Sequence, residues 1–274
     1  MKKTIALLCV FVIVLSGCSN TGSIPENAKN FYRTVITYAG ENESEERHLE
    51  LSMKSEALLK KLMSEKNAFV MDAYNYQPID EKGTHLYKEN ELGGVPIEIS
   101  PNGYSIRISE NYLKYNPIQL ADNEQWDNKI IYDDTTLNVL VPIEYQDKES
   151  VITEKYKEIF YYEKIKVANF YNEDLGKPLD TTSIDELSVN IIYVADNQTY
   201  FTYNPDICPE SDNLITNPLV MLYTGNIHAS YAHSFMSQFT FFESHAEDAY
   251  KDIEPLIIEC NAAESYQKVY SIYE

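Results

Sequence analysis

The sequence of 274 residues carries 22 Lys and Arg against 43 Asp and Glu, which gives a formal net charge of −21. So acidic a chain repels nucleic-acid phosphates, so nucleic acid is not an expected partner, whereas cationic peptides are favoured. The acidity can also serve only to keep an exported domain soluble. A hydrophobic content of 44% excludes a disordered chain and suffices for one sizeable core or two smaller lobes.

The first residues are typical of a secretory signal. Lys2 and Lys3 precede the uncharged run TIALLCVFVIVL at 4–15, which is shorter than the roughly 20 residues of a membrane-spanning helix. The run ends in LSGC at 15–18, which resembles the lipobox of bacterial lipoproteins. We expect a signal peptide at 1–17, lipid attachment at Cys18, and a chain held at the cell membrane on its extracytoplasmic side. The alternative is a plain signal peptide with an incidental cysteine.

Residues 18–30 are rich in Ser, Asn and Gly and predict a flexible tether. An N-terminal lobe is expected over 31–145. It opens with a strand at 31–38, an acidic loop at 41–50, a helix at 51–66 and a strand at 68–74. This order favours two parallel strands joined by a helix with a right-handed crossover.

The rest of the first lobe is expected to contain short strands and turns. Strand patterns occur at 84–89, 95–100 and 104–109, and a helical turn is expected at 111–118, ending before Pro117. Two further strands at 130–134 and 137–141 flank a turn near the end of this lobe.

A C-terminal lobe is expected over 146–274, beginning with a helix at 148–171. Strands at 189–194 and 199–203 predict a hairpin whose tight turn contains Asp196 and Asn197. The apolar run at 219–224 is typical of a buried strand. A strand at 239–242, a helix at 246–260 and a strand at 269–273 complete an α+β fold with mixed sheets and packed helices.

Two cysteines remain once Cys9 is removed with the signal peptide and Cys18 is lipidated. In an exported protein Cys208 and Cys260 can form a disulfide, but they lie far apart in sequence and can also stay free thiols.

Three histidines, His228, His233 and His245, lie close in sequence, near Glu243 and Glu247. Imidazole and carboxylate groups are good zinc or copper ligands. The HxxxxH spacing, however, does not place two imidazoles on one helical face as HExxH does. Polar surface residues are therefore the favoured interpretation, and a metal-dependent hydrolase using this region is the alternative.

Other site signals are weak. Asp133, Asp134 and the acidic run at 41–46 do not follow the alternating pattern of a calcium loop, so solvated turns are expected. The sequence contains no GxSxG elbow, SxxK, P-loop or dinucleotide glycine fingerprint. We therefore expect a protein that is not an enzyme, with no catalytic residue, no metal and no cofactor.

Five stretches together resemble the extracytoplasmic domain of the bacteriocin-associated integral membrane protein family, whose members look like ABC-transporter permease components. They are NYLKYNPI at 111–118, TLNVLVPIEY at 136–145, YFTYNP at 200–205, TNPLVMLYT at 216–224 and KVYSIYE at 268–274. The resemblance implies a role near antimicrobial-peptide export or immunity and supplies no catalytic residues. Family members continue into membrane helices, whereas this sequence has a lipobox, so we expect a stand-alone lipoprotein.

The expected function is that of a non-enzymatic, membrane-anchored surface lipoprotein that serves as a binding or accessory domain. The expected partners are the membrane, through the lipid anchor, and a cationic peptide or an ABC-transporter permease. A purely structural partner of a permease is a further alternative.

Overall fold

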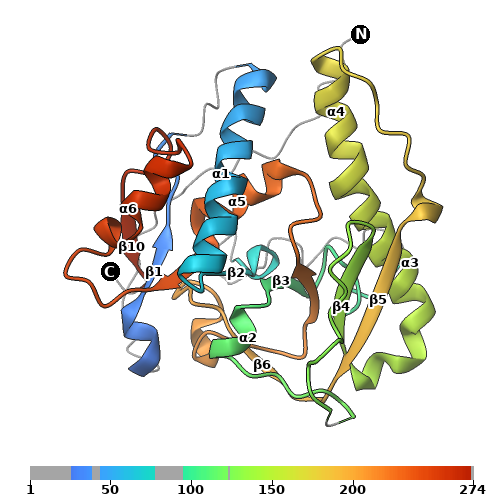
Figure 1. Cartoon of the computed structure of the whole chain (residues 1–274). Coiled ribbons are helices and arrows are strands. Elements are labelled where there is room, and N and C mark those ends of the chain that lie inside the picture. Colours follow the sequence, from blue (N-terminus) through green and yellow to red (C-terminus); the bar gives the residue numbers. More distant parts are fainter. Residues whose placement is uncertain (1–25, 39–43, 78–94, 123, 273–274) are drawn as a thin grey trace.

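One eight-stranded mixed sheet forms the centre of the computed structural model, which describes residues 26–38, 44–77, 95–122 and 124–272 (Figure 1). The strand order is β10-β1-β9-β2-β3-β8-β4-β5. The strands of this sheet are β1 (Phe31–Thr34), β2 (Phe69–Asp72), β3 (Ser105–Ser109), β4 (Thr136–Pro142), β5 (Ser188–Val194), β8 (Leu219–Tyr223), β9 (Thr240–Glu243) and β10 (Val269–Ser271). A separate two-stranded sheet pairs β6 (Thr199–Phe201) with β7 (Leu214–Thr216).

The helices are α1 (Glu45–Glu65), α2 (Tyr112–Tyr115), α3 (Glu149–Tyr161), α4 (Val167–Asp174), α5 (Ala229–Gln238) and α6 (Ala249–Glu259). A π-helical turn, η4 (Tyr162–Lys166), joins α3 to α4, and 3₁₀ turns occur at η1 (Glu26–Asn30), η2 (Tyr74–Tyr76), η3 (Ile143–Lys148), η5 (Ile184–Glu186) and η6 (Pro209–Ser211). In the described part of the chain, no helix has both the length and the apolarity that crossing a membrane requires.

The two faces of the sheet carry separate cores. One core holds apolar side chains of α1, α3, α5 and α6, so these helices cover one face (Figure 1). The other core is built under α2, η2 and the small β6-β7 sheet. Side chains alternate between the faces along each strand, so Val220 and Leu222 of β8 join one core and Met221 joins the other. We refer to the face under α1 and α5 as the helical face.

The expected α+β fold class is confirmed, and so is the parallel relation of the first two strands. β1 and β2 each pair antiparallel with β9, so they run parallel to each other with β9 between them. α1 connects them. It begins at Glu45, inside the stretch expected to be an acidic loop, because Ser44 caps the helix by accepting a hydrogen bond from the Arg47 N–H.

The expected division into lobes at residue 145 is wrong, because strands from both halves alternate in one sheet. β1 from the first half lies between β9 and β10 of the second. β8 from the second half lies between β3 and β4 of the first. Neither half therefore forms the central sheet or its two cores without the other.

The expected hairpin at 189–203 is also wrong. β5 pairs in parallel with β4, while β6 pairs with β7. The tight turn predicted at Asn197 is present, since this residue adopts a positive φ of 61°. The two strands that flank the turn, however, belong to different sheets. Residues 95–100 and 130–134 form turns and bends instead of strands, and the strand expected at 84–89 lies outside the described residues.

The helix expected at 148–171 is confirmed as α3, η4 and α4 in succession. Its π-helical turn is the unexpected feature. Glu163 and Ile165, both within this turn, are buried. A π turn inserts extra backbone into a helix, which changes the side-chain direction at that point.

Cys208 and Cys260 are not bonded to each other. Cys260 belongs to the core of the helical face, whereas Cys208 packs against the core of the opposite face. The sheet therefore separates the two thiols, and the disulfide that the sequence left open does not form. The predicted signal peptide at 1–17 and the lipid site at Cys18 lie outside the described residues.

Candidate functional site

A buried ion pair lies at the middle of the sheet on its helical face. Arg107 of β3 directs one guanidinium nitrogen at both carboxylate oxygens of Glu163, at 2.8 and 2.7 Å. The two side chains are only 6% and 7% exposed. Asp72 of β2 lies directly across from Arg107 in the strand register. We call Asp72, Arg107 and Glu163 the ion-pair cluster.

Local structure explains why charges meet here. β3 alternates Ser105, Arg107 and Ser109 on the helical face with Ile106 and Ile108 on the other, so its polar side is turned toward the helices. The π turn brings Glu163 down onto that side. Burial and the Glu163 charge raise the pKa of the Asp72 carboxyl to about 6, while the Tyr74 N–H and Arg107 oppose the rise.

A second polar group lies where α1, α4 and α5 meet. His48 of α1 shares a 2.6 Å hydrogen bond with the Tyr171 hydroxyl of α4, and the two rings are nearly parallel. Tyr171 also stacks on His228, with ring centroids 4.8 Å apart. The His233 ring stands edge-on to His48 at 5.4 Å. We call His48, Tyr171, His228 and His233 the histidine cluster.

The hydrogen bonds fix the proton positions on His233. The Ser55 hydroxyl donates to the Leu51 carbonyl and accepts from the Tyr266 hydroxyl. Because Ser55 has one proton, the 2.8 Å contact to His233 Nδ1 is best satisfied by an imidazole N–H donating to Ser55. The neutral ring then presents a lone pair at Nε2, which is buried and has no hydrogen-bond partner among the described residues.

His228 has a different role, because it is the N-cap of α5. Its Nδ1 accepts a hydrogen bond from the Ser230 backbone N–H at 3.3 Å and contacts the Ser230 hydroxyl at 2.9 Å. Burial, with a smaller contribution from His48, lowers the pKa of His228 and of His233 to about 4. Burial also lowers the pKa of His48, against the attraction of Glu45.

The structure does not gather the three histidines singled out in the sequence. His228 and His233 lie in the histidine cluster, but His245 is 70% exposed and pairs with Glu243 at 3.2 Å. Within the described ranges, no group of three or more His, Cys, Asp and Glu side chains is arranged to hold a metal ion. Tyr171 contacts both His48 and His228, so their rings pack on an aromatic side chain and do not converge on a common point.

The Ser55–His233 pair is not arranged as a hydrolytic nucleophile and base. Ser55 is fully buried, and its proton is directed at a main-chain carbonyl. A catalytic serine must reach a substrate carbonyl while its base accepts the hydroxyl proton. The hydroxyl of Ser55 meets neither condition, so this pair acts as a structural contact between α1 and α5.

The expected turn at Asp133 and Asp134 is present. Asp133 accepts hydrogen bonds from the Thr135 N–H and the Thr136 hydroxyl, and Asp134 pairs with Lys164 at 2.8 Å. The Asp133 carboxylate therefore stabilises the turn itself, and the Asp134 carboxylate is paired with a lysine of the η4 turn.

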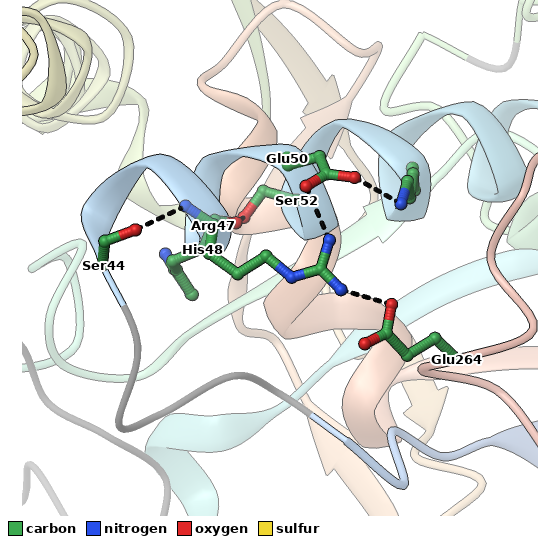
Figure 2. A network of polar contacts seen from close by, with 7 residues as sticks. Ser44, Arg47, His48, Glu50, Ser52 and Glu264 are labelled. Atoms are coloured by element: carbon green, nitrogen blue, oxygen red, sulfur yellow. Dashed lines mark hydrogen bonds and ion pairs between the residues drawn. The ribbon is translucent and has the colours of Figure 1, made fainter.

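The outer side of α1 carries an exposed ion network (Figure 2). Arg47 bonds Glu50 at 2.6 Å and reaches across to Glu264, which lies beyond α6. Glu50 also pairs with Lys54. Figure 2 shows His48 directed away from this network. α1 therefore has a charged outer side and a histidine-bearing inner side at the same turn.

A shallow depression on the surface is lined by Ala246, Glu247, Asp248, Lys251 and Asp252 around the start of α6. Asp252 is paired with Lys66 at 2.7 Å, so part of the acidic lining is neutralised.

Comparison of the chain with known protein families, with curated proteins and with solved structures finds no match. The resemblance carried by the five stretches at 111–274 therefore stays a prediction.

Sequence reasoning missed His48 and all of the ion-pair cluster. Arg107 gave one usable signal, since it is a lone cation within the strand pattern SIRIS. His48 lies in the run 41–50, for which the sequence predicts an acidic loop. Its position on a helix could therefore not be recognised from the sequence.

Proposed function

We propose that the chain is a non-enzymatic, lipid-anchored domain on the extracytoplasmic side of a cell membrane, and that its surface binds a cationic peptide. The observation that carries this proposal is the excess of 43 acidic over 22 basic side chains. The resemblance described above adds a link to antimicrobial-peptide export or immunity, in which the domain serves as a binding or accessory component beside a permease.

The distribution of ion pairs supports the proposal. Basic side chains that already pair with acids include Lys54, Lys60, Lys61, Lys66, Lys129, Lys155 and Lys164. Exposed acids such as Asp206, Glu210 and Asp212 lie on the segment between β6 and β7. The charge left for a partner is therefore negative, and it attracts cations over about 10 Å at 0.1 M salt.

The lack of an accessible catalytic arrangement in the two polar clusters is a second support. Arg107 and Glu163 satisfy each other, and Ser55 is buried beneath α5. Both clusters hold elements together, which favours binding at the surface over chemistry in the interior.

The test compares the full protein in detergent with the variant Cys18→Ala, using a synthetic Lys-rich peptide and a Glu-rich peptide of equal length. We expect the Lys-rich peptide to bind at low salt and to lose about tenfold or more in affinity between 50 and 200 mM salt, because the attraction is screened. The Glu-rich peptide should not bind. Absence of binding at low salt would contradict the proposed partner.

The same variant tests the anchor. Cys18→Ala should lose lipid attachment and membrane retention while its circular dichroism stays unchanged, since the helices and strands of the described residues begin at Glu26. Cys208→Ala is the matched control and should stay in the membrane fraction. Retention of Cys18→Ala in that fraction would show that the lipobox is not used.

A further inference from the structure

The histidine cluster gathers three of the four histidines of the described residues at one interface. His48 comes from α1, while His228 is the N-cap of α5 and His233 lies within that helix. α5 packs on α1, β1 and β9, and α1 also contacts α4. The position of α5 over the sheet thus depends on an interface that can acquire several positive charges in acid.

His228 and His233 perform their structural roles only in the neutral form. His228 Nδ1 must keep a lone pair to accept the Ser230 N–H at the start of α5. A proton there turns the acceptor into a donor and removes the cap. On His233, the second proton would go to Nε2, where no acceptor exists among the described residues. A buried charged N–H without a partner is strongly unfavourable.

The surroundings offer little compensation for these charges. On α1, the Glu45 carboxylate favours the protonated form of His48 but not that of His228 or His233. From other elements, the Tyr171 hydroxyl of α4 contacts His48, and the Tyr266 hydroxyl bonds Ser55, the partner of His233. From the sheet, Arg107 faces the rings of Tyr231 and Phe235 beneath α5, and its charge is already paired with Glu163. The strands β1 and β9 direct the uncharged hydroxyls of Thr34 and Thr240 at main-chain carbonyls of α5.

The histidines also oppose one another. The His48 and His233 rings lie 5.4 Å apart, so two protonated rings would repel across a poorly solvated gap. Charging one ring makes charging the next more costly until the interface separates. Separation lets all three rings reach water and titrate near their ordinary pKa of about 6.5.

We propose that the packing of α5 against α1 and α4 is an acid-sensitive latch, in which protonation of His48, His228 and His233 releases α5 while the central sheet stays intact. Release uncovers the apolar underside of α5, formed by Ala232, Phe235 and Met236, which is buried in the closed form. The inference does not depend on the proposed peptide-binding role.

The direction of the pH effect follows from the folded pKa values. Burial holds the pKa of His228 and His233 near 4, below their ordinary value of 6.5. The closed interface is therefore fully stable above about pH 6.5 and loses stability as the pH falls toward 4. Asp72 acts in the opposite direction, because its raised pKa favours the folded state in acid. The two effects are separated by changing the histidines alone.

The experiment measures amide hydrogen exchange of the full protein at pH 7 and pH 4.5, corrected for the intrinsic exchange rate. We expect protection of α5 to fall by about tenfold or more at pH 4.5, while β3 and β8 keep theirs. Equal protection of α5 at both pH values would overturn the latch. So would a simultaneous loss of protection in α5 and in the sheet.

Asparagine variants identify the groups responsible. His228→Asn keeps an N-cap oxygen and His233→Asn keeps a donor toward Ser55, yet neither can be charged. Each variant should reduce the acid-induced loss of hydrogen-exchange protection in α5 by about threefold or more. His245→Asn, at the exposed histidine, is the matched control and should leave the loss unchanged. The latch is also overturned if His245→Asn acts as strongly as His228→Asn. Should a variant fail to fold, the wild-type exchange profile still decides between the outcomes.

Discussion

Arg107 and Glu163 show how a charged pair is tolerated in the interior. Arg107 gains two short contacts to Glu163, a 3.1 Å contact to the Met221 sulfur, and the faces of two aromatic rings. These contacts offset the loss of hydration, but such pairs add little net stability compared with an apolar replacement. The cost appears when one partner is removed alone.

Glu163→Gln should therefore destabilise the protein by about 3 kcal/mol, because Arg107 is left buried without its main counter-charge. Urea unfolding monitored by circular dichroism measures the change. Glu158→Gln is the matched control on α3, since Glu158 pairs with Lys155 at the surface, and its effect should stay within about 0.5 kcal/mol. Equal losses in the two variants would contradict a buried ionic role for Glu163.

The residues of the candidate site were only partly predictable. His228 and His233 were singled out because histidines are rare and close in sequence here. Their partner His48 is separated from them by most of the chain, and only the packing of α1 on α5 brings it near. Glu163 was not recognisable, because a local pattern does not reveal a π turn that redirects one side chain inward.

At the scale of elements, the start of α1 depends on local chemistry. Ser44 caps the helix, Glu45 and Glu46 occupy its first turn, and Arg47 connects it to Glu264 (Figure 2). Acidic side chains near a helix N-terminus are favoured by the helix dipole. The same residues that suggested a loop are therefore a helix start.

Ser44→Ala should lower the free energy of unfolding by about 1 kcal/mol, because the Arg47 N–H loses its capping acceptor. Thermal or urea unfolding measures this loss. Ser44→Asp preserves a capping oxygen and should remain near the wild-type stability. A Ser44→Ala variant as stable as the wild type would show that the ion network alone fixes the start of α1.

Elements with strong periodicity were the predictable part of the fold. The helix at 51–66 and the buried strand at 219–224 correspond to α1 and β8, because each buries a continuous apolar set. The α5 helix was missed, since its polar sequence ASYAHSFMSQ places only a narrow side in the core. The hairpin at 189–203 failed because a favourable turn does not determine which strands pair across it.

At the scale of the whole molecule, the sheet depends on pairings between distant parts of the chain. β3 pairs with β8, and β1 pairs with both β9 and β10. Thr34 of β1 also donates a hydrogen bond to the Met236 carbonyl of α5. Removing either half of the chain would leave strands and helices without their partners.

Fragments 1–145 and 146–274, produced separately, should therefore show no cooperative unfolding transition. Mixing the two fragments should restore a transition, because complementary strands can then complete the sheet. Calorimetry and circular dichroism measure the transitions, with the intact chain as reference. A cooperative transition in either fragment alone would support the two-lobe interpretation that the sheet topology argues against.

The place of β1 between β9 and β10 also determines when, during synthesis of the chain, the sheet can form. β1 and α1 emerge early, but the strands that flank β1 and the α5 helix that covers α1 follow only after residue 228. Such long-range pairings form slowly, and the apolar side chains of the early segments stay exposed until the later segments have been synthesised. Folding is thereby deferred until most of the chain is present, a property that the proposed export of the chain as an unfolded polypeptide would require.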